Sequence, residues 1–192
     1  MNNQPLFQGN MIQLTAVDPE KDAALISSWT TSPEFVKRYF DGIFRTYTTA
    51  EVKKLFKEKL KKADESRQDY YFAIRENEDE KMVGLLHFGW IMLSNQSAWF
   101  NMYFSSLEDF EKYSSEVLKM ALRYGFMELS LHRLCLTLPS YDEDNILLYE
   151  KAGFLRETQS RQAVFHNGRF YDLLTYGILR SEWKKLQMEG QL

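Results

Sequence analysis

The side chains best suited to nucleophilic or metal chemistry are the single cysteine, Cys135, and the three histidines. Cys135 stands in an apolar run of strand length, a setting that favours a buried, inert thiol over a nucleophile. His87, His132 and His166 lie far apart and lack the short spacing typical of metal ligands. We therefore expect no metal site, no cysteine-based catalysis and no internal disulfide.

One block of basic side chains could bind phosphate or an acidic partner. It lies on a segment that opens with a capping box, Thr48-x-x-Glu51, and continues with apolar residues at helical spacing. Lysines on the other face of such a helix are usually its solvated side, which is the interpretation we favour. The lysines are Lys53, Lys54, Lys57, Lys59, Lys61 and Lys62, and the apolar residues are Val52, Leu55, Phe56, Leu60 and Ala63.

Composition limits the remaining classes of protein. A chain of 192 residues with 44% hydrophobic residues can bury one ordinary core, so we expect a single domain over residues 1–192. The net charge of −3 gives no indication of a nucleic-acid partner, and no apolar run is long enough to span a membrane. The N-terminal residues lack the pattern of a secretory signal, so we expect a cytoplasmic protein. A homodimer is compatible with the sequence, which does not fix the oligomeric state.

The first half of the chain reads as a strand, three helices and a meander of antiparallel strands. Met11–Ala16 alternates as an opening strand would. Asp18-Pro19-Glu20 and Ser32-Pro33-Glu34 are both helix starts, each with an N-cap oxygen, a first-turn proline and an acid. The lysine-rich helix follows, and then strands are expected over 70–74, 82–93 and 98–104. The two short helices are expected to bury Ala23, Leu25, Ile26 and Trp29, and then Phe35, Val36 and Tyr39.

The second half reads as a β-α-β arrangement closed by a hairpin. A long helix leads into Leu131–Leu138, an apolar run typical of a strand covered on both faces. A short helix carrying Tyr149 comes next. Gln162–His166 and Arg169–Leu179 then pair about Asn167-Gly168, a strong hairpin signal. The order predicts an α/β (α+β) domain with a mixed, mostly antiparallel central sheet flanked by helices.

The stretch from Leu131 to Phe154 resembles a known family. Ile146–Phe154, an apolar helix with Tyr149 that Gly153 closes before Phe154, resembles the "N…lYeKlGF" pattern of the GNAT acyl-CoA N-acyltransferase fold. The start and the end of the chain are similar to the RimJ/RimL-like branch, the ribosomal-protein N-terminal acetyltransferases. The residues that carry this similarity are Gly9–Leu14, Trp29, Ser32-Pro33-Glu34, Arg161–Phe165, Asn167–Asp172 and Tyr176–Trp183.

The resemblance implies N-acetylation of a primary amine with acetyl-CoA as co-substrate, bound where strands 98–104 and 131–138 splay apart. The pantetheine amides would pair with the first strand near Tyr103, Phe104 and Ser105. Main-chain N–H groups at the start of the long helix would hold the pyrophosphate, because the helix macrodipole favours an anion there. The positions concerned are Lys112, Tyr113, Ser114 and Ser115, with Asp142 and Asn145 as further cofactor contacts.

Tyr149 stands at the position of the tyrosine that, in the family, protonates the departing thiolate. Considered alone, Tyr149 is also a core aromatic, because it shares a helix face with Ile146 and Ala152. A buried phenol needs a partner for its hydroxyl, which favours the functional role within the resemblance.

The pyrophosphate loop departs from the family pattern Q/R-x-x-G-x-G/A. Asp109 takes the glutamine or arginine position, and the chain has no glycine from Glu108 to Ser115. Carboxylates would therefore lie where phosphates should bind, and the backbone loses the close approach that glycine allows. The same residues read as a self-capped helix, Ser105-x-x-Glu108 or Ser106-x-x-Asp109. The substituted glycine positions are Phe110, Lys112 and Ser114, of which Lys112 could compensate partly as a point charge.

Two catalytic positions also differ from the family. Trp99 replaces a frequent glutamate, and Asp142 replaces an asparagine, with Asn145 one turn later as a substitute donor. The base that deprotonates the amine must then be another side chain or a water. The candidates are Asp142, Glu143, Asp144 and Asp172.

Three interpretations of function remain open. The chain is an acetyl-CoA-dependent enzyme acting on a protein N-terminus or a small amine, a catalytically degenerate GNAT-fold binding or regulatory module, or an enzyme with another acyl donor. Aromatic side chains would either form the mouth of the acceptor cleft or pack onto the core, and Asp41 and Asp172 would suit a cationic amine. The aromatics are Phe165, Phe170, Tyr171, Tyr39, Phe40, Phe44 and Tyr47.

Overall fold

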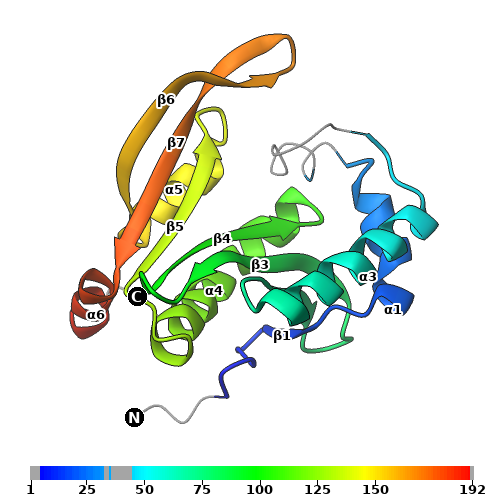
Figure 1. Ribbon diagram of the computed structural model, residues 1–192, viewed down its shortest axis with the longest axis horizontal. Helices are drawn as coiled ribbons and strands as arrows, with labels where there is room; N and C mark the ends of the chain where they lie inside the picture. The colour runs from blue at the N-terminus through cyan, green and yellow to red at the C-terminus, as the bar shows by residue number, and fades with distance from the viewer. Residues whose placement is uncertain (1–4, 33–34, 36–44, 191–192) are drawn as a thin grey trace. The chain divides into compact units, whose positions relative to one another are not determined.

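The computed structural model describes residues 5–32, 35 and 45–190 (Figure 1). The helix expected from Ser32-Pro33-Glu34 lies outside these residues, apart from Phe35, which is buried. The helices are α1 (Pro19–Trp29), α3 (Thr49–Ser66), α4 (Leu107–Arg123), the π-helix η1 (Tyr124–Glu128), α5 (Glu143–Lys151) and α6 (Arg180–Met188). The strands are β1 (Ile12–Ala16), β2 (Tyr70–Glu76), β3 (Met82–Met92), β4 (Ser97–Phe104), β5 (Arg133–Pro139), β6 (Leu155–His166) and β7 (Arg169–Leu179).

The strands form a seven-stranded sheet in the order β1-β2-β3-β4-β5-β7-β6. β4 and β5 pair in parallel, whereas β2 pairs antiparallel with β1 and β3, and β7 with β5 and β6. The predicted fold class is therefore confirmed. The residues fall into two compact units, a first unit of Met1–Ile91 with Asn101–Ala121 and a second unit of Met92–Phe100 with Leu122–Leu192. That residues 1–192 form one domain stays a prediction.

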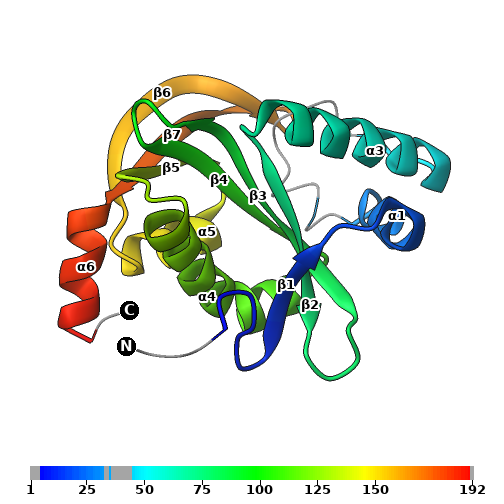
Figure 2. The ribbon, with the colours of Figure 1, turned by 60° about the horizontal axis from the view of Figure 1, so that its bottom comes forward.

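In the first unit, α1 and α3 lie side by side (Figures 1 and 2) and share an apolar core with the sheet. Both predicted helix starts that fall here are confirmed: the Asp18 carboxylate accepts from the N–H of Glu20, and Thr48 and Glu51 form the capping box. The core contains all the predicted inward residues of α1 except Leu25, which is 36% exposed. On α3, Leu55 is likewise exposed, because the apolar stripe that contacts the sheet is narrower than the sequence pattern.

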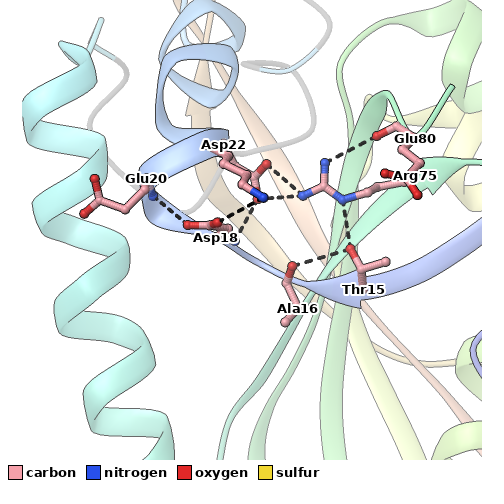
Figure 3. A network of polar contacts seen from close by, with 8 residues as sticks. Thr15, Ala16, Asp18, Glu20, Asp22, Arg75 and Glu80 are labelled. Carbon is pink, nitrogen blue, oxygen red and sulfur yellow. Dashed lines mark hydrogen bonds and ion pairs between the residues drawn. The ribbon is translucent and has the colours of Figure 1, made fainter.

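A buried ion pair fixes α1 to the sheet (Figure 3). The Arg75 guanidinium on β2 donates to both carboxylate oxygens of Asp22, at 2.7 and 2.8 Å, and through Nε to Thr15 on β1. Asp22 also accepts from the N–H of Asp18, the residue that caps the same helix. The strand, the helix and the cap are thus connected by one carboxylate.

α4 contacts the rest of the first unit through Phe110, Tyr113 and Glu116. The Phe104 ring of β4 meets Phe110 edge to face, with centroids 5.8 Å apart. The Tyr113 hydroxyl donates to Glu76 at the end of β2, and the Glu116 carboxylate accepts from the N–H groups of Asn10 and Met11. α4 therefore contacts the chain just before β1 and the C-terminal ends of β2 and β4.

The second unit is built on the strand order β4-β5-β7-β6. The β6–β7 hairpin (Figure 1) turns at Asn167 and Gly168, both at positive φ, as the sequence predicts. β6 is longer than expected and almost wholly exposed. Trp183 of α6 packs on Phe126 of the π-helix, with ring centroids 5.2 Å apart. Cys135 on β5 is buried, as expected, and burial raises the pKa of its thiol.

Candidate functional site

Tyr149 lies on α5 with its side chain buried in the second unit. Its ring meets the ring of Phe100 on β4 edge to face, with centroids 5.9 Å apart, and that of Phe154 at 5.2 Å. The core role predicted for Tyr149 is therefore real. The same contacts hold its ring against β4, the strand expected to bind the co-substrate.

Gly153 ends the helix that carries Tyr149. Its φ is +86°, and the N–H of Phe154 donates to the carbonyl of Tyr149 at 3.0 Å, the long hydrogen bond of a Schellman cap. A Cβ at this position would overlap the Leu186 side chain of α6. The predicted left-handed helix terminus at Gly153 is confirmed. Its hydrogen bond to the Tyr149 carbonyl holds the backbone of Tyr149 in the last turn of α5.

Asp142 and Asn145, two expected cofactor contacts, bond to each other. Both are buried at the start of α5, and the Asn145 amide donates to Asp142 at 2.7 Å. Asn145, which we expected to replace the asparagine of the family, therefore directs its side-chain amide towards the Asp142 carboxylate.

The start of α4 is a self-capped helix. The helix begins at Leu107, so Asp109–Ser115 lies inside it rather than in a loop before it. Ser106 Oγ accepts from the N–H of Asp109, its carbonyl accepts from the N–H of Phe110, and the hydroxyls of Ser105 and Ser106 donate to the Asp109 carboxylate. Of the two capping patterns offered by the sequence, Ser106-x-x-Asp109 forms.

The four residues that we expected to contact the pyrophosphate, 112–115, do not lie at a free end of α4. Main-chain N–H groups beyond the first turn of a helix bond to carbonyls four residues earlier, which applies to residues 112–115. Tyr113 and Ser114 are buried, and Ser115 is exposed. The Lys112 ammonium lies 3.6 Å from a Glu76 carboxylate oxygen and over the Tyr113 ring, so it is directed towards β2.

On β4, the three expected pantetheine contacts differ in what their main chains can do. The N–H of Ser105 donates to Val83 on β3 at 2.9 Å. Residues two apart in a strand point the same way, so the main chain of Tyr103 also faces β3, and that of Phe104 faces away from it. Phe104 is therefore the residue of the three whose main-chain amide groups face away from β3.

Asp172, one candidate base, is tied into the β6–β7 hairpin. It accepts from the N–H of Gln162 at 2.9 Å and from the Gln159 side chain, and its own N–H donates to Ser140. The Gln162 bond is the main reason that the pKa of Asp172 is lowered. A carboxylate held in this way is a poorer base. Trp99, which replaces the family glutamate, is partly exposed on β4 and pairs with Cys135.

The hairpin aromatics divide into two groups. Phe165 and Phe170 pack on each other at the tip, with 60% and 63% of their surface exposed. Tyr171 instead contacts Tyr141, which also stacks on His166. Burial raises the pKa of Tyr141 to about 12. Of the other aromatics named for an acceptor cleft, Tyr47 packs against the first-unit core, and Tyr39, Phe40 and Phe44 lie outside the described residues, as does Asp41.

A pair formed by a histidine and a carboxylate in the first unit was missed by sequence reasoning. His87 on β3 lies 2.8 Å from Asp69, which precedes β2, measured between Nε2 and Oδ1. The two residues are 18 positions apart, and only the β2–β3 register brings them together, so their spacing carries no signal.

Among residues 5–32, 35 and 45–190, no cluster of three or more His, Cys, Asp or Glu side chains is arranged to hold a metal ion. Within the same residues, none of the helices has the length and apolar character needed to cross a membrane.

Comparison with known families identifies this arrangement. The model of the acetyltransferase (GNAT) domain matches residues 12–155, three quarters of the chain. The chain belongs to the GNAT family of acetyltransferases. Acetyl-CoA is the acetyl donor that this family uses.

Individual GNAT relatives match over most of the chain. The SPbeta prophage-derived uncharacterized N-acetyltransferase YokL of Bacillus subtilis is 25% identical over 180 residues, 93% of this chain and 95% of YokL. The spermidine N(1)-acetyltransferase of Vibrio cholerae is 26% identical over 137 residues, 67% of this chain and 79% of that protein. The crystal structure of the spermidine N-acetyltransferase of Vibrio cholerae with CoA and spermine has a TM-score of 0.77 at 22% identity, covering 90% and 98% of the two chains.

Proposed function

We propose that this GNAT protein transfers the acetyl group of acetyl-CoA directly to a primary amine, with Tyr149 as the general acid. The observation that carries the proposal is the placement of Tyr149, whose buried ring is fixed against Phe100 of β4 by the Gly153 cap. A phenol held in one position can deliver its proton without a search over rotamers.

The proposed reaction needs two proton transfers. The amine nitrogen attacks the thioester carbonyl carbon, and its proton passes to a base. As the carbon–sulfur bond breaks, the Tyr149 hydroxyl gives its proton to the departing sulfur. The main chain of Phe104 on β4 is proposed to orient the pantetheine arm by amide hydrogen bonds.

For the acceptor, we propose a small polycationic amine of the spermidine class as the first candidate. The Vibrio cholerae relative named for spermidine aligns over two thirds of this chain. A protein N-terminus is the second candidate. It rests on the similarity of Gly9–Leu14 and Asn167–Asp172 to the RimJ/RimL-like branch.

The start of α4 fits a pyrophosphate poorly, and this favours weak acetyl-CoA binding. The Asp109 carboxylate lies in the first turn, and Ser106 already takes the N–H groups of Asp109 and Phe110. A negative charge at this end of a helix is stabilised by the macrodipole, so it competes with a phosphate for the same position. We propose that this segment is a degenerate pyrophosphate loop. A binding or regulatory module that has lost acetyl transfer is therefore the alternative function.

Two measurements separate these functions. Calorimetry with acetyl-CoA, and with CoA as a comparison, tests co-substrate binding by the purified protein. Release of free thiol is then followed with spermidine, and separately with a peptide bearing a free N-terminus. Turnover with spermidine supports the first acceptor, and turnover with the peptide alone supports the second. Absence of binding at millimolar acetyl-CoA would favour the module.

A further inference from the structure

His87 and Asp69 form an acid–base pair in the first unit that the proposed mechanism has not used. An ionised carboxylate can only accept hydrogen bonds, so the 2.8 Å contact to Asp69 places the proton of the neutral ring on Nε2. Nδ1 is then left with its lone pair. Within the described part of the chain, Nδ1 has no hydrogen-bond partner, and the His87 side chain keeps 23% of its surface exposed.

The ring of His87 is held in one orientation from a second side. It stacks on the ring of Tyr71, its cross-strand neighbour on β2, with centroids 4.2 Å apart and planes 4° from parallel. The Lys59 ammonium of α3 lies over the Tyr71 ring, 5.6 Å from its centroid. The titratable groups that face His87 are therefore Asp69, Tyr71 and Lys59. Burial is the main cause that lowers the pKa of His87, and Asp69 partly opposes it.

Gly89 leaves the space in which the pair lies. A Cβ at this position would stand 2.7 Å from His87 Cε1 and 3.0 Å from the Asp69 carboxylate oxygen. The φ of Gly89 is not in the left-handed region, so its backbone conformation does not by itself call for glycine. The absence of a side chain here preserves the contact between His87 and Asp69.

The pair lies beside the strand expected to carry the thioester. Counting the antiparallel β3–β4 register from the Ser105–Val83 hydrogen bond places His87 opposite Asn101 on β4. Leu85, two residues before His87, and Tyr103, two after Asn101, belong to the core shared with α1 and α3. The His87 side chain therefore lies on the face of the sheet that α1 and α3 cover, close to residues 103–105 of β4.

Several carboxylates of the first unit already have structural partners, which makes them less available as bases. They are Asp22, paired with Arg75; Glu76, paired with Tyr113 and Lys112; Asp109, paired with Ser105 and Ser106; and Glu116, which accepts from Asn10 and Met11. The His87 ring is different because one nitrogen is oriented and the other keeps its lone pair.

We propose that His87 is the general base of acetyl transfer and that Asp69 is its positioning residue. This inference rests on the proposed function. The attacking amine forms the new carbon–nitrogen bond, and its proton moves to His87 Nδ1. The carbon–sulfur bond breaks, and the leaving thiolate is protonated as in the proposed function. His87 then returns its proton to solvent, so that the base is restored.

The test is the pH profile of kcat/KM for spermidine with full-length wild type, His87→Gln and Asp69→Asn. His87→Gln should lower kcat by at least about 100-fold with little change in acetyl-CoA affinity. Asp69→Asn removes a contact that raises the pKa of His87, so the acid limb should move to lower pH. Gly89→Ala should lower kcat in the same direction without changing either residue of the pair. His132→Gln, at an exposed histidine, is the matched control.

The outcomes distinguish this inference from the proposed function. A folded His87→Gln enzyme with wild-type kcat, or an acid limb that does not move in Asp69→Asn, overturns the role of His87 and leaves acetyl transfer intact. Restoration of His87→Ala turnover by added imidazole supports a base, because a purely structural histidine would not be replaced in this way. Wild-type protein that binds acetyl-CoA but acetylates no amine overturns the proposed function, and this inference with it.

Discussion

Arg75 on β2 holds both carboxylate oxygens of Asp22 on α1, at 2.7 and 2.8 Å, in a nearly solvent-free position. The Asp22 side chain is 4% exposed and that of Arg75 17%. The guanidinium also donates to Thr15 on β1, so three elements of the first unit depend on one pair (Figure 3). Buried charges of this kind are stabilising only while both partners are present.

Asp22→Asn should therefore destabilise the protein strongly. It leaves Arg75 buried without its counter-charge, which typically costs about 3–5 kcal/mol. Urea denaturation followed by circular dichroism measures the loss. Glu20→Gln is the matched control, because Glu20 on the same helix pairs with Lys53 and Lys57 at the surface and its removal should leave the midpoint nearly unchanged. Equal midpoints for both variants would contradict the anchoring role.

Gly153→Ala should destabilise the second unit by more than ~1 kcal/mol, since a Cβ is disfavoured at positive φ and here would also overlap Leu186. Gly168→Ala is the matched control, because Gly168 has a similar φ of +77° but nothing within 4 Å of the added carbon. The difference between the two unfolding free energies isolates the contact with α6. If Gly168→Ala proves the more destabilising, the Leu186 side chain moves aside freely.

The start of α4 can be tested by restoring the family loop. The combined change Asp109→Arg, Lys112→Gly and Ser114→Gly removes the competing carboxylate and loosens the helix. Acetyl-CoA affinity should rise at least about tenfold, or ~1.4 kcal/mol, in calorimetry. Asp64→Asn, which raises the net charge by one as the combined change does, lies at an exposed position of α3 and controls for net charge. A folded variant with unchanged affinity would show that Asp109 and the missing glycines do not limit binding.

Tyr149→Phe should lower kcat at least about tenfold, because a positioned general acid is typically worth 10²–10⁴ in rate and water can replace part of it. The phenylalanine ring keeps the contacts with Phe100 and Phe154, so acetyl-CoA affinity and stability should change little. Steady-state kinetics with the acceptor that turns over fastest gives the measurement. A wild-type kcat in this variant would mean that Tyr149 only packs in the core and does not act as the general acid.

The pH dependence of stability should carry a contribution from His87. Its folded-state pKa lies below the ordinary value of 6.5, so between these two values the unfolded chain binds the proton and the folded protein does not. Stability must therefore fall as the pH drops through 6.5 towards the folded-state pKa, and it is unaffected well above 6.5. Thermal unfolding from pH 5 to 8 should show a smaller slope for His87→Gln than for wild type. The same slope in both would mean that His87 titrates normally.

Local chemistry in the sequence was enough to predict most elements and one key helix end. Proline after an N-cap aspartate, the Thr48–Glu51 capping box and the Asn167-Gly168 turn act within a few residues, and each forms as expected. The same holds for Gly153, since a left-handed helix terminus depends on a single residue. The π-helix over Tyr124–Glu128 and the long exposed strand β6 were not anticipated, because neither follows from hydrophobic period alone.

The sequence by itself determined the family, the mixed, mostly antiparallel sheet that goes with it and the helix that carries Tyr149, because these rest on short patterns in a fixed order along the chain. Tertiary structure alone decided which charged groups meet. Asp22 pairs with Arg75, 53 residues away in the sequence, and the register of β2 and β3 brings His87 next to Asp69. Contacts of this kind depend on distances in space, which no local spacing encodes. The folded structure also decided between two capping patterns at α4, where Ser106 and Asp109 bond to each other, so that the N–H of Asp109 already has a partner.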